Sequence, residues 1–170
     1  IMVNTNGIAF MGGSQVNLNS FTASSLNIAD RFITESFVPG DGVAQFQGDT
    51  GFIKVFEGAQ ISAGNFGRVM LLAPTVVNRG EVKAPDGQVI AAAASKVYLS
   101  SAGADSNVRG LLVEIDTPAA ATGLDVANTS VRDGVLDGRA VALTNAAEDK
   151  LGAVTNRGTL ASDRGNVTMI

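Results

Sequence analysis

The sequence predicts an all-β protein, folded as a right-handed parallel β-helix (a solenoid) with looped-out extra-helical segments. Three observations support this prediction. Glycine is abundant while proline is scarce, short apolar runs have the length of strands, and an internal repeat recurs at a period of about 20 residues. A chain of 170 residues has the usual length of one domain, so we expect residues 1–170 to form a single β-helix domain.

The composition favours strands joined by tight turns. The chain has 20 glycines and 4 prolines, and the hydrophobic fraction is 45%. Valine suits the pleated surface of a strand because its side chain branches at Cβ, whereas glycine and asparagine favour turns. The hydrophobic fraction is sufficient for a packed core and too high for a disordered chain.

Short apolar runs, bounded by glycine, asparagine or aspartate, are the predicted strands. These strands are 8–10, 15–18, 21–28, 43–46, 52–56, 68–72, 75–77, 88–92, 97–99, 110–115, 140–143, 154–156 and 166–170. The alanine-rich stretch 90–98 could also form a helix, but the valine and isoleucine around it favour strand. Residues 145–151 are expected to form one loose helical turn.

An internal repeat predicts how these strands are arranged. Segment 77–89 aligns with segment 155–167 on the pattern Asn-Arg-Gly-x-apolar, then four residues, then Gly-x-Val, and a weaker copy occupies 58–69. Three short strands joined by tight turns would make one coil of a solenoid, and stacked coils would bury valine and isoleucine along a central axis. A β-sandwich is the alternative, but it predicts hairpins and no such period.

The repeat also predicts which side chains face the core. Val82 lies 21 residues after Ile61, and Val89 lies 20 residues after Val69. Since neighbouring residues of a strand point to opposite faces, we expect Val82 and Val89 inside and the adjacent Lys83 and Gln88 outside.

The two Asn-Arg-Gly motifs predict the number of coils. They begin at Asn78 and Asn156, which lie 78 residues apart, a separation of about four coils. We therefore expect the coils to continue through 100–150, with loops at 101–107 and 118–123 projecting from corners, where a solenoid tolerates insertions.

Charge and residue usage exclude several functions. The net charge is −4 and the pI is about 4.7, so no basic field is available to bind nucleic acid. The chain contains no cysteine and no histidine. Thiol and imidazole catalysis and Cys or His metal sites are therefore excluded, and we expect no catalytic residue, cofactor or metal. No apolar run has the length of a membrane-spanning helix, and residues 1–7 do not resemble a signal peptide.

Several motifs together resemble a known family. Asn4-Thr5-Asn6-Gly7-Ile8, Gly13-Ser14-Gln15-Val16-Asn17 and Phe21 to Ile28 resemble the conserved secretion region (haemagglutination activity domain) of two-partner-secretion exoproteins. This family includes filamentous haemagglutinin, the high-molecular-weight adhesins and the contact-dependent inhibition toxins of Gram-negative bacteria. Segments 71–80 and 84–89 resemble its repeating coils, and the resemblance is strongest over 3–99.

The chain also departs from the family in two ways. Family members usually have Asn-Pro-Asn-Gly-Ile where this chain has Thr5, and they carry a second Asn-Pro-Asn motif and a cap upstream. The chain therefore resembles the later part of such a domain, within a much longer exoprotein.

The resemblance implies a non-enzymatic secretion and adhesion module. An outer-membrane pore partner would recognise it in the periplasm, and it would fold outside the cell as part of an adhesin or toxin stalk. The implied location is secreted or at the bacterial cell surface, after transit through the periplasm. Other parts of the exoprotein would bind a host-cell or biofilm glycan or a bacterial surface receptor. Its secretion motif would comprise Asn4, Asn6, Gly7 and Ile8.

Each motif also has a purely structural interpretation. Asn4 and Asn6 can form Asx-turns closed by Gly7 with a positive φ. Six further residues are expected to be structural residues at coil corners, with asparagine amides bonded to backbone. They are Asn78, Gly80, Gly87, Asn156, Gly158 and Gly165.

The alternative function is a carbohydrate-active β-helix enzyme (a polysaccharide lyase or hydrolase) or a sugar-binding β-helix. Such an enzyme gathers several charged side chains in one groove. The acidic residues here are scattered beside glycines and in turns, which favours the non-enzymatic interpretation. They are Asp86, Asp105, Asp116, Asp125, Asp133 and Asp163.

Overall fold

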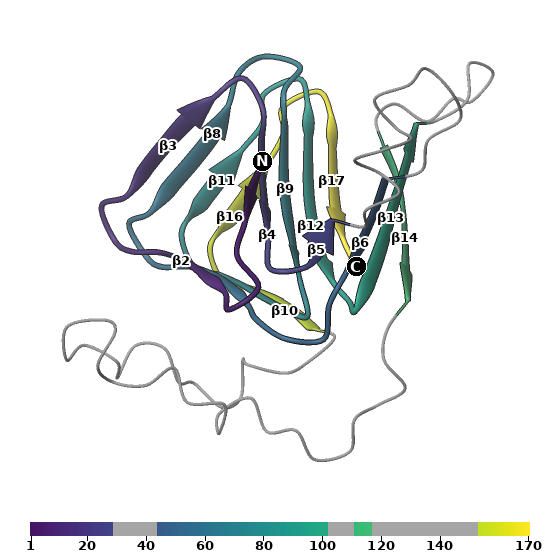
Figure 1. Cartoon of the computed structure of the whole chain (residues 1–170). Coiled ribbons are helices and arrows are strands. Elements are labelled where there is room, and N and C mark those ends of the chain that lie inside the picture. The colour runs from purple at the N-terminus through teal and green to yellow at the C-terminus, as the bar shows by residue number, and fades with distance from the viewer. Residues whose placement is uncertain (29–43, 102–110, 117–152) are drawn as a thin grey trace.

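The computed structural model describes residues 1–28, 44–101, 111–116 and 153–170 (Figure 1). Every regular element within these ranges is a β-strand, which confirms the all-β prediction. The strands form three parallel sheets, A, B and C, and one antiparallel sheet, D. No helix in these ranges is long and apolar enough to cross a membrane.

Each parallel sheet collects strands from distant parts of the chain. In spatial order, sheet A contains β1 (Met2–Val3), β4 (Phe21–Ser24), β9 (Arg68–Ala73), β12 (Gln88–Ala93) and β17 (Asn166–Met169). Sheet B contains β2 (Ile8–Phe10), β7 (Ile53–Val55), β10 (Thr75–Asn78) and β15 (Ala153–Asn156). Sheet C contains β3 (Gln15–Leu18), β8 (Gln60–Ala63), β11 (Glu81–Lys83) and β16 (Thr159–Ala161).

Within the described residues, the chain visits sheets B, C and A in that order four times (Figure 1). We call these visits passes 1 to 4, and their strands are β2–β3–β4, β7–β8–β9, β10–β11–β12 and β15–β16–β17. Within each sheet, strands of consecutive passes are hydrogen-bonded neighbours. The four passes are therefore stacked, and each is joined to the next by backbone hydrogen bonds in all three sheets.

The strand register confirms the predicted repeat. Val82 lies opposite Ile61, and Val89 lies opposite Val69, as the separations of 21 and 20 residues require. In pass 4, Leu160 lies opposite Val82 and Val167 lies opposite Val89, so each of these two columns of stacked residues remains apolar. Residues one repeat apart therefore occupy the same place in successive passes.

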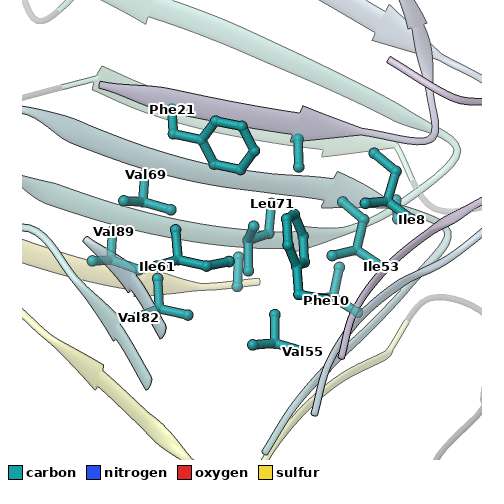
Figure 2. Close-up of a cluster of buried hydrophobic side chains, with 14 of the residues drawn as sticks. Ile8, Phe10, Phe21, Ile53, Val55, Ile61, Val69, Leu71, Val82 and Val89 are labelled. Atoms are coloured by element: carbon teal, nitrogen blue, oxygen red, sulfur yellow. The ribbon is translucent and has the colours of Figure 1, made fainter. Parts of the chain in front are cut away.

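The apolar columns of sheets A, B and C meet in one enclosed core (Figure 2). Phe10 and Phe21 pack edge to face there, with ring centroids 5.9 Å apart. Val82 and Val89 are fully buried in this core, as predicted. Lys83 is exposed, also as predicted, but Gln88 is buried on the opposite side of its strand from Val89.

Gln88 is buried because sheet A has no solvent-facing side at β12, where all six residues are buried. Sheet D contains β5 (Asn27–Ile28), β6 (Ala44–Gln47), β13 (Lys96–Ser101) and β14 (Leu111–Asp116). Phe46 and Val97 of sheet D form a second core with Leu72 and Ile90 of sheet A. The strands of sheet D thus pack against the outer face of sheet A. The alanine-rich stretch 90–98 falls in two strands, β12 and β13, and not in a helix.

The expected coil count is wrong. Asn78 and Asn156 lie directly opposite each other on the neighbouring strands β10 and β15. In the same way, β11 pairs directly with β16 in sheet C, and β12 pairs directly with β17 in sheet A. No further pass separates passes 3 and 4, because a strand in the stack has only two neighbours. Within 100–150, the described strand β14 pairs with β13 in the antiparallel sheet. The predicted strand 140–143 lies outside the described residues, as does the predicted loop 118–123. Of the predicted loop 101–107, only Ser101 is described, and it is the last residue of β13.

The buried and exposed positions of the repeat give a direct test of this register. Val89→Ala should lower the free energy of unfolding by about 1–3 kcal/mol, because it leaves a cavity in the enclosed core. Lys83→Ala removes only an exposed side chain and its surface ion pair with Glu81, so it should cost at most about 1 kcal/mol. Urea denaturation measures both, and equal losses for the two variants would contradict the register.

Candidate functional site

The predicted secretion motif forms a tight turn at the start of pass 1. The Asn6 N–H donates to Asn4 Oδ1 over 3.0 Å, and the Gly7 N–H donates to the Asn4 carbonyl over 3.0 Å. Asparagine at the first position and glycine at the fourth are the residues that such a β-turn favours. The Asx-turn predicted for Asn4 is therefore present, and both asparagines are exposed.

The end of this motif is anchored in pass 2. The Ile8 N–H donates to the Phe52 carbonyl over 2.8 Å, and the Ile8 side chain is buried in the core. Gly7 has a φ of 118°, and a Cβ there would come within 2.8 Å of the Phe52 ring. Only glycine fits both restrictions. The motif thus combines an exposed polar part, Asn4 to Asn6, with a rigid attachment at Gly7 and Ile8.

The two Asn-Arg-Gly motifs form a corner between sheets B and C. The Asn78 side chain is 1% exposed, and its Oδ1 accepts from the Gly80 N–H over 3.2 Å. Its Nδ2 donates to Asn156 Oδ1 over 2.8 Å and to the Thr159 carbonyl over 3.2 Å. Asn78 therefore bonds backbone, as predicted, and it also binds the asparagine stacked next to it.

The corner glycines allow backbones to pass close to one another. A Cβ on Gly87 would lie 1.8 Å from the Gly67 carbonyl oxygen, and one on Gly165 would overlap the Gly87 carbonyl in the same way. Gly80 and Gly158 are restricted similarly, by carbonyl oxygens at 2.6 and 2.1 Å. Close approach, and not a positive φ, makes glycine necessary at these four predicted corner positions.

An ion pair joins passes 3 and 4 at the corner between sheets C and A. Arg164 Nε and Nη2 lie 2.5 and 2.8 Å from the two carboxylate oxygens of Asp86. This bidentate contact lowers the pKa of Asp86 from its ordinary value of 3.8, chiefly through the hydrogen bond from Arg164.

The acidic residues within the described ranges do not gather in one place. Asp86 pairs with Arg164, Asp116 pairs with Lys96 at 3.4 Å in sheet D, and Asp163 is exposed. Among the described residues, no three acidic side chains are close enough to hold a metal ion. The other candidates lie outside the described residues; they are Asp105, Asp125 and Asp133.

The sequence analysis missed one surface feature beside pass 1. An open hollow of about 520 Å³ lies over the ends of the paired strands β3 and β8 and the residues that follow them. Phe66, in the turn beside it, is 77% exposed and has a φ of 61°. Alignment of the repeats could have revealed Phe66 as unusual. It occupies the position that Asp86 occupies in the next repeat, a turn position where a polar residue is usual.

No protein-family model matches the chain, and no curated protein is significantly similar to it.

Removing the Asn78 side chain should destabilise the stack. Asn78→Ala leaves the buried Gly80 N–H without its side-chain acceptor, so we expect a loss of about 1–3 kcal/mol in the free energy of unfolding. Asn156→Ala is the matched comparison: Asn156 is exposed, and without it the Asn78 Nδ2 still donates to the Thr159 carbonyl, so its removal should cost less, no more than about 1 kcal/mol. A larger loss for the control in urea denaturation would contradict the assignment of Asn78 as the buried member of the pair.

The Asp86–Arg164 pair should make stability depend on pH in the acid range. Because the folded pKa of Asp86 lies below 3.8, the pair stabilises the fold above about pH 4, and this contribution disappears as the pH falls through the lowered pKa. Asp86→Asn keeps a residue that tolerates positive φ but removes the charge. The melting temperatures of the two proteins should therefore differ near neutral pH and converge in acid; a constant difference would show that the pair contributes nothing.

Proposed function

We propose that the chain is a right-handed parallel β-helix and belongs to the secretion domain of a two-partner-secretion exoprotein. In this proposal it is a non-enzymatic module of a large adhesin or contact-dependent toxin. An outer-membrane pore partner recognises it in the periplasm of a Gram-negative bacterium, and it folds after reaching the cell surface.

The exposed turn at Asn4 to Gly7 is the observation that carries the proposal. The turn matches the family's secretion motif at every position except Thr5, and its polar part is exposed while Gly7 and Ile8 fix its position in the folded stack. The Asx-turn is closed within the motif itself, by the Asn6 N–H and Asn4 Oδ1, so it can form before the rest of the chain folds and be recognised in the periplasm.

The stacked passes support both the fold and the route of export. A solenoid in which each coil contacts only its neighbours can form coil by coil as the chain emerges from a pore. Each of passes 1 to 4 pairs only with the passes directly beside it. The chain also contains no cysteine, so no disulfide can close a loop before transport through an oxidising periplasm.

Secretion of variants tests the proposal. The full reading frame that contains this chain would be expressed with and without its candidate outer-membrane pore partner, and the protein released from the cells would be measured. The proposal predicts release only with the pore. Asn4→Ala combined with Asn6→Ala should reduce that release, because the turn loses its side-chain acceptor and its exposed amides.

A conservative variant separates recognition from turn formation. Asn4→Asp keeps an oxygen that can accept from the Asn6 N–H, so the turn should persist, but the amide is lost. We expect Asn4→Asp to be folded and secreted less than wild type, while Asn65→Ala, which alters another exposed turn asparagine, should be secreted normally. Equal release of all variants, or release without the pore, would contradict the proposed function.

A further inference from the structure

Asn6 is followed by glycine, and no other asparagine of the chain is. Asparagine is one of the chemically labile residues of proteins. Its side-chain amide can be attacked by the backbone nitrogen of the next residue, and glycine hinders this attack least because it has no Cβ. The pair Asn6–Gly7 is therefore the most reactive asparagine position of the sequence, and it lies in the exposed turn at the start of pass 1.

The folded turn holds this pair in an unreactive arrangement. The Gly7 N–H donates to the Asn4 carbonyl over 3.0 Å, so the nitrogen that would attack keeps its proton in a hydrogen bond. In a β-turn closed in this way the third residue, here Asn6, has a ψ of about 0°. At this ψ the Gly7 nitrogen is rotated away from the Asn6 Cβ, whereas closing a five-membered ring needs the two atoms nearly eclipsed. Rotation to that ψ would turn the Gly7 N–H away from its acceptor.

The residue after the pair makes such a rotation harder still. The Ile8 N–H donates to the Phe52 carbonyl over 2.8 Å, and the Ile8 side chain is buried in the core. The main chain is thus fixed on both sides of the bond that must rotate. Only unfolding of pass 1, locally or with the whole chain, releases it.

We propose that Asn6 is a site of spontaneous deamidation that reacts only when this turn unfolds. The Gly7 nitrogen attacks Asn6 Cγ and forms a C–N bond, and the side-chain nitrogen leaves as ammonia with the proton of the Gly7 N–H. Water then opens the resulting succinimide. Attack of water at one carbonyl of the ring gives aspartate, and attack at the other gives isoaspartate.

The two products have different effects on the fold. Aspartate leaves the main chain unchanged and adds a negative charge to the exposed turn. Isoaspartate inserts a CH₂ group into the main chain directly before Gly7. Gly7 already lies against the Phe52 ring, where even a Cβ would come within 2.8 Å, and the next residue, Ile8, must lie opposite Ile53 in sheet B. A lengthened main chain cannot satisfy both restraints, so isoaspartate at position 6 prevents the turn from attaching to pass 2.

Deamidation therefore acts as a timer on the unfolded chain. A chain that folds promptly is protected, whereas a chain that stays unfolded progressively loses the ability to form this turn. One consequence rests on the proposed function: a chain that waits too long in the periplasm would lose its secretion motif. The chemistry itself depends only on the turn, so it is tested on the purified protein without a pore partner, and its failure would leave the proposed function untouched.

Peptide mass spectrometry measures the reaction. The purified chain is incubated at one pH and temperature, folded in buffer and unfolded in guanidinium chloride, and the modified fraction of Asn6 is followed over time. We expect modification to be at least about tenfold faster in the unfolded chain, because unfolding frees the Gly7 nitrogen. Asn65 is the internal comparison, since it is also exposed in a turn but is followed by Phe66, and it should stay intact in both states.

Asn6→Ser separates deamidation from other damage to the unfolded chain. Serine keeps a polar side chain at this exposed position but cannot form a succinimide. After the same incubation and removal of the denaturant, the wild-type protein should contain a fraction that melts at a lower temperature and grows with its isoaspartate content, and Asn6→Ser should contain none. An intact Asn6 in the unfolded chain, equal rates in the two states, or modification of Asn65 as fast as that of Asn6 would overturn the proposal. A low-melting fraction of the same size in Asn6→Ser would also overturn it.

Discussion

Neighbouring passes are held one strand spacing apart by the backbone hydrogen bonds of three parallel sheets. This spacing, about 4.8 Å, forces equivalent residues into columns, so each column must consist of side chains that tolerate close stacking. The core columns meet this requirement with apolar residues such as Val82 and Val89. At the corners the same requirement selects glycine, because a Cβ on Gly87 or Gly165 would overlap the carbonyl oxygen of the pass beside it. At the corner of Asn78 it permits a polar residue because the backbone of Gly80 and Thr159, together with the stacked Asn156, satisfies the buried amide.

The register of the strands could be predicted from the sequence, but the way in which successive passes are connected could not. Repeated apolar residues and Asn-Arg-Gly motifs predicted which residues lie opposite one another, since stacking imposes one rule on every pass. The same motifs gave a wrong coil count, because the separation of Asn78 and Asn156 was converted into coils although the two residues are direct neighbours. Sheet D could not be predicted from the repeat. Its antiparallel pairs have no shared period: β13 pairs both with the next strand, β14, and with β6, which comes much earlier in the chain. In the sequence its strands are short apolar runs like those of the stack.

The covering of sheet A by sheet D explains why β12 has no polar face. A strand that faces solvent on one side alternates apolar and polar residues, whereas β12 is apolar on both sides apart from Gln88. The motif proposed to act on the pore partner lies elsewhere, at a turn on the outside of the stack. The Asn4 turn is attached to the adjacent pass by the hydrogen bond from the Ile8 N–H to the Phe52 carbonyl, while its asparagine side chains are exposed. Corners can vary in this way without disturbing the columns.

The central claim is that passes 3 and 4 are direct neighbours, and engineered disulfides test it most directly because the chain has no cysteine of its own. Glu81 and Thr159 are opposite residues on β11 and β16, one strand spacing apart, which is within the reach of a disulfide. Gln60 lies one pass further away, about 10 Å from Thr159, which is too far. Under mild oxidation, Glu81→Cys with Thr159→Cys should form an intramolecular disulfide, and Gln60→Cys with Thr159→Cys should not. Failure of the first pair to cross-link in the folded protein, or cross-linking of the second instead, would contradict the stacking described here.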